Sequence, residues 1–452
     1  MEQAPVVDAM IDTASEACYR AVRRDIILGK LEPTARLRLE RLRESYGASV
    51  STLREVLNRL TGERLVVAEG QRGFAVAPVT QEEFGDLASL RELLEVHALQ
   101  QAFDKGDLEW EGQVVGAYHK LGRIEARMLQ GEHSQSELWK HYDKEFHHRL
   151  IAACGSDELL KAHASVFDRY LRYQIIAVIF RGAEAACEHQ LLRDCAVERD
   201  AGRAARVLSG HIAACVEHTA AGGMLARGDA AASFSPARDS VSATTWQQVR
   251  GDILSGRLAP GRKLKLERLR TDYGASVSIL REVLNRLATE GLVIAEGQRG
   301  FEVAPVSPDN LRELAELRLL LEERALADSF RNGDVEWEAR VIAAHHKLAA
   351  MEEQMDRGDH SQIDLWKRRD WGFHQALISA CGSDVLMHLH GGVFDKYLRY
   401  QMIALSFRGR IAAAEHRALL DAALERDHDS ANRILKAHLL GGVEHALKSE
   451  TI

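Results

Sequence analysis

The stretch Gly47-Ala-Ser-Val-Ser-Thr-Leu-Arg-Glu-Val-Leu-Asn-Arg-Leu60 occurs twice in this chain of 452 residues. Its second copy, Gly274-Ala-Ser-Val-Ser-Ile-Leu-Arg-Glu-Val-Leu-Asn-Arg-Leu287, is identical at 13 of the 14 positions and lies 227 residues further on. The same offset, without a gap, relates Trp139 to Trp366 and His211 to His438. The chain is therefore one module of about 210 residues written twice.

The repeated stretch has the pattern of a helix that reads DNA. Its four apolar residues follow the spacing i, i+3, i+4, i+7 from Leu53 to Leu60, which predicts one buried face, and Ser49 is a suitable N-cap. The opposite face carries groups that can hydrogen-bond phosphates and base edges. These candidate DNA-binding residues are Ser49, Ser51, Thr52, Arg54 and Asn58, with Ser276, Ser278, Arg281 and Asn285 in the second copy.

The surrounding residues predict a winged helix-turn-helix. Apolar spacing indicates helices over Cys18–Gly29 and Leu39–Tyr46, before the repeated stretch. After it, two β-rich runs within Leu65–Val79 flank the turn Gly-Gln-Arg-Gly, which is typical of a hairpin. Arg72 and Arg299 are then expected at the wing tips, where an arginine can enter the minor groove.

The charge distribution supports DNA binding at the start of each module. The whole chain carries a net charge of −8. Residues 20–79 have 12 Lys+Arg and 7 Asp+Glu, giving +5, and residues 247–306 have 10 and 7, giving +3, so the remainder carries −8 − 8 = −16. Two basic segments on an acidic body fit nucleic-acid binding that is confined to those segments.

The rest of each module is expected to be helical. From Thr80 to Ala221 only Gly106-Asp and Cys154-Gly-Ser-Asp interrupt the helical pattern, and Asp107 and Ser156 are candidate caps. The fold class is thus mainly α. The expected domains are a winged helix-turn-helix at 1–79, a helical bundle at 80–221, a linker at 222–245, a second winged helix-turn-helix at 246–306 and a second bundle at 307–452.

Several histidines in the helical part form a candidate metal site. Asp143 and His147 are four residues apart on one helix face, and His189 and His211 follow on later helices. The second copy has Asp370, His374, His416 and His438. Three imidazoles and one carboxylate suit Zn²⁺, Ni²⁺ or Mn²⁺. The alternative is an ordinary surface contact between Asp143 and His147. The recurring Trp110 and Trp139 are interpreted as core residues.

The order of these motifs resembles the GntR family of bacterial transcription regulators, in the FadR subfamily with an FCD ligand domain. Ser49-Val-Ser-Thr-Leu-Arg-Glu-Val-Leu57 resembles the family's recognition helix. Arg91-x3-Glu95, Asp143-x2-Phe146-His147, Glu188-His189 and His211 resemble its metal-binding branch, with the CsiR-like regulators most similar. The sequence departs from the family pattern at Val50 and Val277, where an arginine is usual, and at Thr52 and Ile279, where a proline is usual.

The resemblance implies a function for both parts of the module. It implies one divalent metal per FCD domain, most simply zinc, with a small carboxylate effector bound beside it. Candidate effector-binding residues are Arg91, Arg172, Arg318 and Arg399, for which a surface or salt-bridged role is the alternative. The expected function is a metabolite-responsive repressor that pairs its two modules within one chain on a palindromic operator, with the recognition helices about one DNA turn apart.

Other functions are weaker alternatives. A metal-dependent, hydrolase-like enzyme using the Asp/His3 sites would leave the winged domains unexplained, so no catalytic residue is assigned. A helical interaction protein with empty sites is the third alternative. No apolar run reaches the length of a membrane span, and the N-terminus lacks the pattern of a secretion signal, so a cytoplasmic protein without membrane contact is expected.

Overall fold

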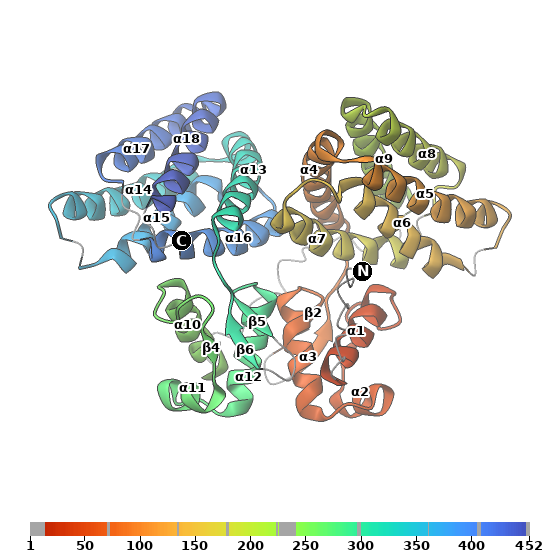
Figure 1. Ribbon diagram of the computed structural model, residues 1–452, viewed down its shortest axis with the longest axis horizontal. Coiled ribbons are helices and arrows are strands. Elements are labelled where there is room, and N and C mark those ends of the chain that lie inside the picture. The colour runs from red at the N-terminus through yellow and green to blue at the C-terminus, as the bar shows by residue number, and fades with distance from the viewer. Residues whose placement is uncertain are drawn as a thin grey trace, which may run out of the picture. The chain divides into compact units, whose positions relative to one another are not determined.

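The computed structural model in Figure 1 describes residues 14–69, 73–132, 135–177, 180–222, 225, 241–295, 300–359, 361–404 and 408–448. The chain divides into two compact units. The first contains residues 1–78, 232–250 and 261–304, and the second contains residues 79–231, 251–260 and 305–452. Among the described residues, no helix is both long and apolar enough to cross a membrane.

The first unit contains two winged helix-turn-helix domains, as predicted. The elements of the first domain are α1 (Ala14–Ile27), β1 (Arg36–Leu37), α2 (Leu39–Tyr46), α3 (Val50–Gly62), β2 (Val66–Ala68) and β3 (Phe74–Val76). The hairpin of β2 and β3 is confirmed, with Val67 opposite Ala75. The sequence did not predict β1, which adds a third antiparallel strand beside β3 in the order β1-β3-β2.

Local chemistry explains how α2 and α3 meet. Gly47 ends α2 in the left-handed conformation with φ 64°, which glycine adopts without a steric cost, and its N–H donates to the Arg43 carbonyl. Ser49 then caps α3 by accepting a hydrogen bond from the Thr52 N–H at 3.1 Å. The predicted apolar face of α3 is confirmed, because the four residues from Leu53 to Leu60 are all buried.

The second domain repeats this arrangement. Its elements are α10 (Val241–Leu254), β4 (Lys263–Leu264), α11 (Leu266–Tyr273), α12 (Val277–Thr289), β5 (Val293–Ala295) and β6 (Phe301–Val303). The linker predicted over 222–245 is too long at its C-terminal end, because α10 already begins at Val241. Val241 lies 227 residues after Ala14, the first residue of α1, so the small polar residues of 241–245 belong to the repeated helix.

The second unit is all-helical, as predicted. The first copy contains α4 (Gln81–Lys105), α5 (Leu108–Leu129), α6 (Ser136–Ile151), α7 (Asp157–Ile176), α8 (Ala183–Glu198) and α9 (Ala201–Gly222). The second contains α13 (Pro308–Asn332), α14 (Val335–Asp356), α15 (Ile363–Ile378), α16 (Asp384–Ile403), α17 (Arg410–Glu425) and α18 (His428–Leu447). The predicted caps are confirmed: Asp107 accepts from the Trp110 N–H and Ser156 from the Leu159 N–H.

Each helical domain is built around its long first helix. Helix α4 packs against α6, α7 and α9, and α13 packs against α15, α16 and α18. Trp110 and Trp139 are buried, which confirms their interpretation as core residues. The indole of Trp110 also donates to the Arg149 carbonyl at 2.8 Å, so it ties α5 to α6. This packing brings the polar inner faces of α6, α8 and α9 together.

Candidate metal centre and nucleic-acid interface

Three helices of each helical domain contribute to one buried polar cluster. In the first copy, α6 supplies Asp143 and His147, α8 supplies His189 and α9 supplies His211. The corresponding residues of the second copy are Asp370, His374, His416 and His438, on α15, α17 and α18. All eight side chains are buried. The structure therefore brings together residues that the sequence separates by up to 68 positions.

The clusters have the spacing of a metal site. In the second copy, one potential ligand atom from each of the four residues lies within 4.8 Å of all the others. In the first copy this holds for the three histidines, and Asp143 Oδ1 lies 3.5 Å from His189 Nε2. The matching distance in the second copy, from Asp370 Oδ1 to His416 Nε2, is 3.2 Å.

Each of the three histidines in the first cluster is held by a glutamate through its Nδ1 atom. The distances are 2.5 Å from His147 to Glu95, 2.7 Å from His189 to Glu125 and 2.7 Å from His211 to Glu188. A carboxylate can only accept, so each Nδ1 carries the proton and each Nε2 keeps its lone pair. The second copy repeats the pattern. The Nδ1 distances are 3.1 Å from His374 to Glu322, 2.6 Å from His416 to Glu352 and 2.8 Å from His438 to Glu415.

The donor set fits a divalent metal. The Nε2 atoms of His147, His189, His374 and His416 are buried and make no hydrogen bond among the described residues. A buried polar atom without a partner is costly unless something else satisfies it. Imidazole nitrogens oriented by carboxylates on their other side, with one aspartate beside them, are a ligand set typical of Zn²⁺ and similar ions.

Burial sets the charge state of the clusters. It lowers the pKa of His211 and of His438 to about 3, against the opposite effect of Glu188 and Glu415. It also lowers the pKa of His147 and His374. These four imidazoles are therefore neutral at pH 7, as metal ligands must be.

The carboxylates of the clusters are ionised. Burial alone would raise the pKa of Asp143, but the Lys140 ammonium and the nearby imidazoles hold that pKa below its ordinary value. Asp370 behaves in the same way beside Lys367. Burial would lower the pKa of His416, yet the nearby carboxylates of Asp370 and Glu352 raise that pKa to about 9.

The four candidate effector arginines are all buried, which excludes a helix-surface role. Arg91 Nε donates to Glu95 at 2.7 Å, and its guanidinium lies 4.3 Å from the Phe167 ring centroid. Arg318 pairs with Glu322 in the same way, so the salt-bridged alternative holds for both. The charges that act on the pKa of Arg172 are those of Tyr173, Glu83 and Arg169. Tyr400 acts on the pKa of Arg399 in the same way. For these two arginines the effector-binding role stays a prediction.

Sequence reasoning missed three further polar residues at each cluster. Glu125 holds His189. Lys140 Nζ lies 3.9 Å from Asp143 Oδ2 and donates a hydrogen bond to Gln174 Oε1. Arg181 Nη2 lies 3.1 Å from His211 Nδ1. Their counterparts are Glu352, Lys367 and Arg408. Recurrence at the 227-residue offset was the available signal, but it is shared by many residues and does not single these out.

The recognition helices present their predicted polar face. Ser49, Ser51 and Arg54 are exposed, and Thr52 and Asn58 are half-buried. Their counterparts Ser276, Ser278 and Arg281 are exposed as well. Arg72 and Arg299, predicted at the wing tips, lie outside the described residues. The preceding helix adds exposed arginines that were not predicted to bind DNA: Arg41 and Arg43 on α2, and Arg268 and Arg270 on α11.

The two recognition helices contact each other within the first unit. Asn285 of α12 donates a hydrogen bond to the Glu55 carboxylate of α3, and Gly62 lies against Thr289. The two helices lie side by side in this unit. The expected spacing of one DNA turn concerns the helices on a bound operator and stays a prediction. Asn285, predicted to bind DNA, is used at this helix–helix contact.

Comparison with known proteins agrees with this arrangement of domains. Residues 14–76 and 242–303 match the family described as bacterial regulatory proteins, gntR family, and residues 86–214 and 313–441 match the FCD domain. Over 197 residues the chain is 38% identical to the uncharacterized HTH-type transcriptional regulator BphR of Paraburkholderia xenovorans (strain LB400), covering 43% of this chain and 80% of that protein.

Other similar proteins carry related descriptions. Over 203 residues the chain is 32% identical to the HTH-type transcriptional repressor GlaR of Escherichia coli (strain K12), covering 43% of this chain and 90% of that protein. Among solved structures, E. coli McbR/YncC aligns with a TM-score of 0.41 and 20% identity, covering 47% of this chain and 99% of that chain.

Proposed function

Because the chain belongs to the GntR family of transcriptional regulators, with its helix-turn-helix and FCD domains each present twice, we propose that it is a metabolite-responsive repressor. In this proposal the two modules of one chain act as a pseudo-symmetric dimer on a palindromic operator. Each FCD domain binds a divalent metal and a small carboxylate effector. The observation that carries the proposal is the pair of buried Asp/His3 clusters whose imidazoles are oriented by glutamates. The family and its named relatives are regulators, so the hydrolase-like alternative is not supported.

The proposed metal ligands are Asp143, His147, His189 and His211, with Asp370, His374, His416 and His438 in the second copy. A bound metal would supply a positive partner for a carboxylate oxygen of the effector. Arg91 and Arg318 are the better candidates for a further contact, since Nη1 of Arg91 and Nη2 of Arg318 are buried without a hydrogen bond among the described residues. An arginine can bind a carboxylate through two parallel hydrogen bonds.

The exposed side chains of α3 and α12 would read the operator. Arg54 and Arg281 can each form two hydrogen bonds with a guanine, and the arginines of α2 and α11 can contact phosphates. Linking two modules raises the effective concentration of the second to the order of millimolar. A single chain could then occupy the whole operator. The effector would act by favouring one placement of the two DNA-binding domains, which changes operator affinity.

A DNA-binding assay tests the proposal. The purified full chain, loaded with zinc, is titrated onto DNA that flanks its own gene, with and without C4–C6 dicarboxylates such as glutarate. We expect binding at submicromolar concentration and at least a tenfold change with one dicarboxylate. The variant His147→Ala/His374→Ala should bind the same DNA without responding to the effector. A response that survives in this variant would refute effector sensing at the metal sites, and no binding to any flanking DNA would refute the operator.

A further inference from the structure

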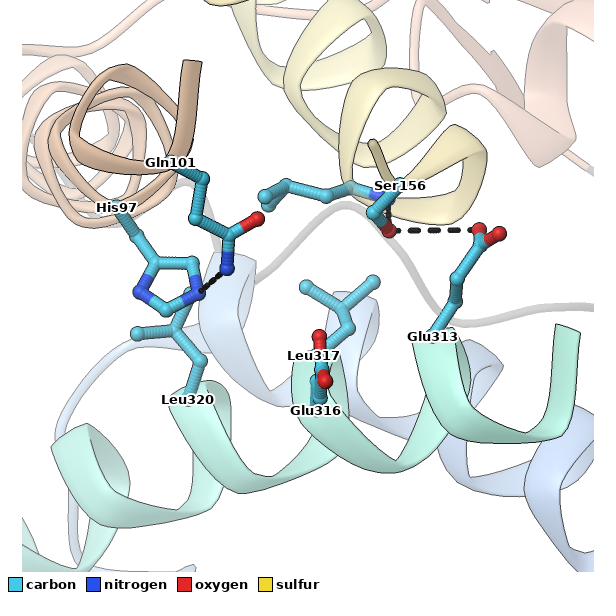
Figure 2. Close-up of a pocket in the computed structure, with 8 residues that line it drawn as sticks. His97, Gln101, Ser156, Glu313, Glu316, Leu317 and Leu320 are labelled. Atoms are coloured by element: carbon cyan, nitrogen blue, oxygen red, sulfur yellow. Dashed lines mark hydrogen bonds between the residues drawn. The ribbon is translucent and has the colours of Figure 1, made fainter. Parts of the chain in front are cut away.

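The two FCD domains contact each other within the second unit through α4 and α7 of the first copy and α13 and α16 of the second. Figure 2 shows one half of this contact, where Glu313 of α13 faces the N-terminus of α7. Its carboxylate accepts from Ser156 Oγ at 3.4 Å and from the Glu158 N–H at 3.0 Å. In the other half, Asp86 is hydrogen-bonded to Ser383. These acidic caps are alike in both copies, so they do not distinguish one copy from the other.

The next pair of charges does distinguish the copies. In the same half as Glu313, Glu158 of the first copy accepts from Lys396 Nζ of the second at 2.8 Å. Asn310 Nδ2, also of the second copy, lies 3.3 Å from the same carboxylate. The Glu158 side chain is 8% exposed and that of Lys396 is 23% exposed, so this ion pair is largely shielded from water.

The other half of the contact is built differently. The counterpart of Lys396 is Arg169, which pairs with Glu83 of its own copy and not across the contact. The counterpart of Glu158 is the buried, uncharged Val385. Glu83 in turn corresponds to Asn310, and each of these two accepts a hydrogen bond from an equivalent tyrosine. Three positions have therefore changed together between the copies.

We propose that these three differences make the face selective, so that the first FCD domain pairs with the second and not with another copy of itself. Counted over these three positions alone, each half of the mixed pair is neutral, because Lys396 balances Glu158 in one half and Arg169 balances Glu83 in the other. Two first-copy domains would place Glu83, Arg169 and Glu158 in each half, a net charge of −1.

Two second-copy domains would give the opposite imbalance. Each half would then contain Lys396 with Asn310 and Val385, a net charge of +1 over these three positions. Lys161 also reaches Glu158 at 3.1 Å, but its side chain is 66% exposed and its charge is screened by water. Charges left without a partner in a mostly buried contact are strongly unfavourable. This inference rests on the proposed pairing of the two modules, but not on the operator or the effector.

Native mass spectrometry of a nicked chain tests the inference. A protease site is inserted between residues 230 and 231 of the full chain, and the protein is cut after folding. The cut protein is then left for a day, so that first and second modules from different chains can exchange partners. We expect the ratio of mixed pairs (first with second module) to same-copy pairs to be at least tenfold higher than random pairing would give. A statistical mixture, or modules that separate fully, would overturn the inference. Because no DNA is present, neither result depends on operator binding.

A charge rescue in the uncut chain provides the second test. Glu158→Val leaves Lys396 unbalanced and should lower the melting temperature. Adding Asn310→Glu gives the second copy the arrangement that Glu83 has in the first, so it should restore most of the loss. Asn310→Glu alone adds an unbalanced carboxylate beside Glu158 and should also destabilise. If the melting temperature of the double variant falls by as much as the losses of the two single variants added together, the proposed charge matching is refuted.

Discussion

Glu352 holds His416 by its Nδ1 atom at 2.6 Å and so orients the ring whose Nε2 faces Asp370 in the second Asp/His3 cluster. Removing the carboxylate charge should weaken metal binding by about 10–100-fold, because an outer partner orients the ring and raises its basicity. The variant is Glu352→Gln, measured by competition with a chelator of known affinity. Its matched control is Glu353→Gln, the exposed neighbour on the same helix. Equal losses in both variants would contradict the assigned role.

Metal content should follow the number of intact clusters. We expect close to two zinc ions per chain after purification without chelator, and close to one in His374→Ala, because that change removes a ligand from one cluster only. Elemental analysis gives the ratio. His346→Ala, which alters an exposed histidine of α14, should leave the content at two. A wild-type chain that binds no zinc, nickel or manganese would exclude the metal sites.

Losing the metal should also lower stability. A ligand that binds only the folded state stabilises it by about 4 kcal/mol when its concentration is a thousand times its Kd. Chelator should therefore lower the melting temperature of the wild type, and it should have a smaller effect on His147→Ala/His374→Ala. Equal shifts in the two proteins would show that the chelator acts elsewhere.

The sequence was enough to predict the features that depend only on residues close together in the chain. The spacing from Leu53 to Leu60 encodes a buried helix face, and Ser49, Asp107 and Ser156 cap helices three residues away, so short patterns were enough. Asp143 and His147 could be paired because one helical turn brings them together. The strand β1 has only two residues and was missed, since its pairing partners in β3 lie 37 and 39 positions further along the chain.

The surroundings of the Asp/His3 clusters could not be predicted in this way. Glu125 is 64 residues from His189, and Glu95 is 52 residues from His147, so only the packed bundle brings each pair together. The contact between Glu55 and Asn285 spans 230 residues and depends on how two domains pair. These relationships are set by tertiary packing, for which a single sequence carries no periodic signal.

Arg54 and Arg281 should each contribute to operator binding. Replacing either by alanine removes an exposed guanidinium from a recognition helix and should cost about 1–3 kcal/mol if it contacts a base. The loss should disappear on an operator in which the contacted base is already altered, which would identify the base that is read. Arg331→Ala, an exposed change on α13, is the control in the same titration. An unchanged affinity in both variants would remove these residues from the interface.

The two half-sites should differ slightly in their preferred sequence. Thr52 presents a hydroxyl at the start of α3, 2.9 Å from Ser49 Oγ, whereas the equivalent Ile279 has none. We expect operators selected by the wild type to be imperfect palindromes. Ile279→Thr should make the two halves more alike, and Thr52→Ile should do so with a different common sequence. Perfectly palindromic selection by the wild type would contradict this prediction.

Gly333 marks a close approach in the second helical domain. A methyl group there would lie 2.6 Å from Trp337 Cε3 and 2.7 Å from the Ser329 carbonyl oxygen, and neither the buried indole nor the helix backbone can move easily. Gly333→Ala should therefore destabilise the domain by about 1–3 kcal/mol through overpacking. Gly391 of α16 has no atom within 4 Å of the same added group. Gly391→Ala should be neutral or stabilise by up to about 1 kcal/mol, since alanine favours a helix interior. Denaturant unfolding of the two variants compares them directly, and a Gly333→Ala chain as stable as Gly391→Ala would show that Trp337 is free to shift.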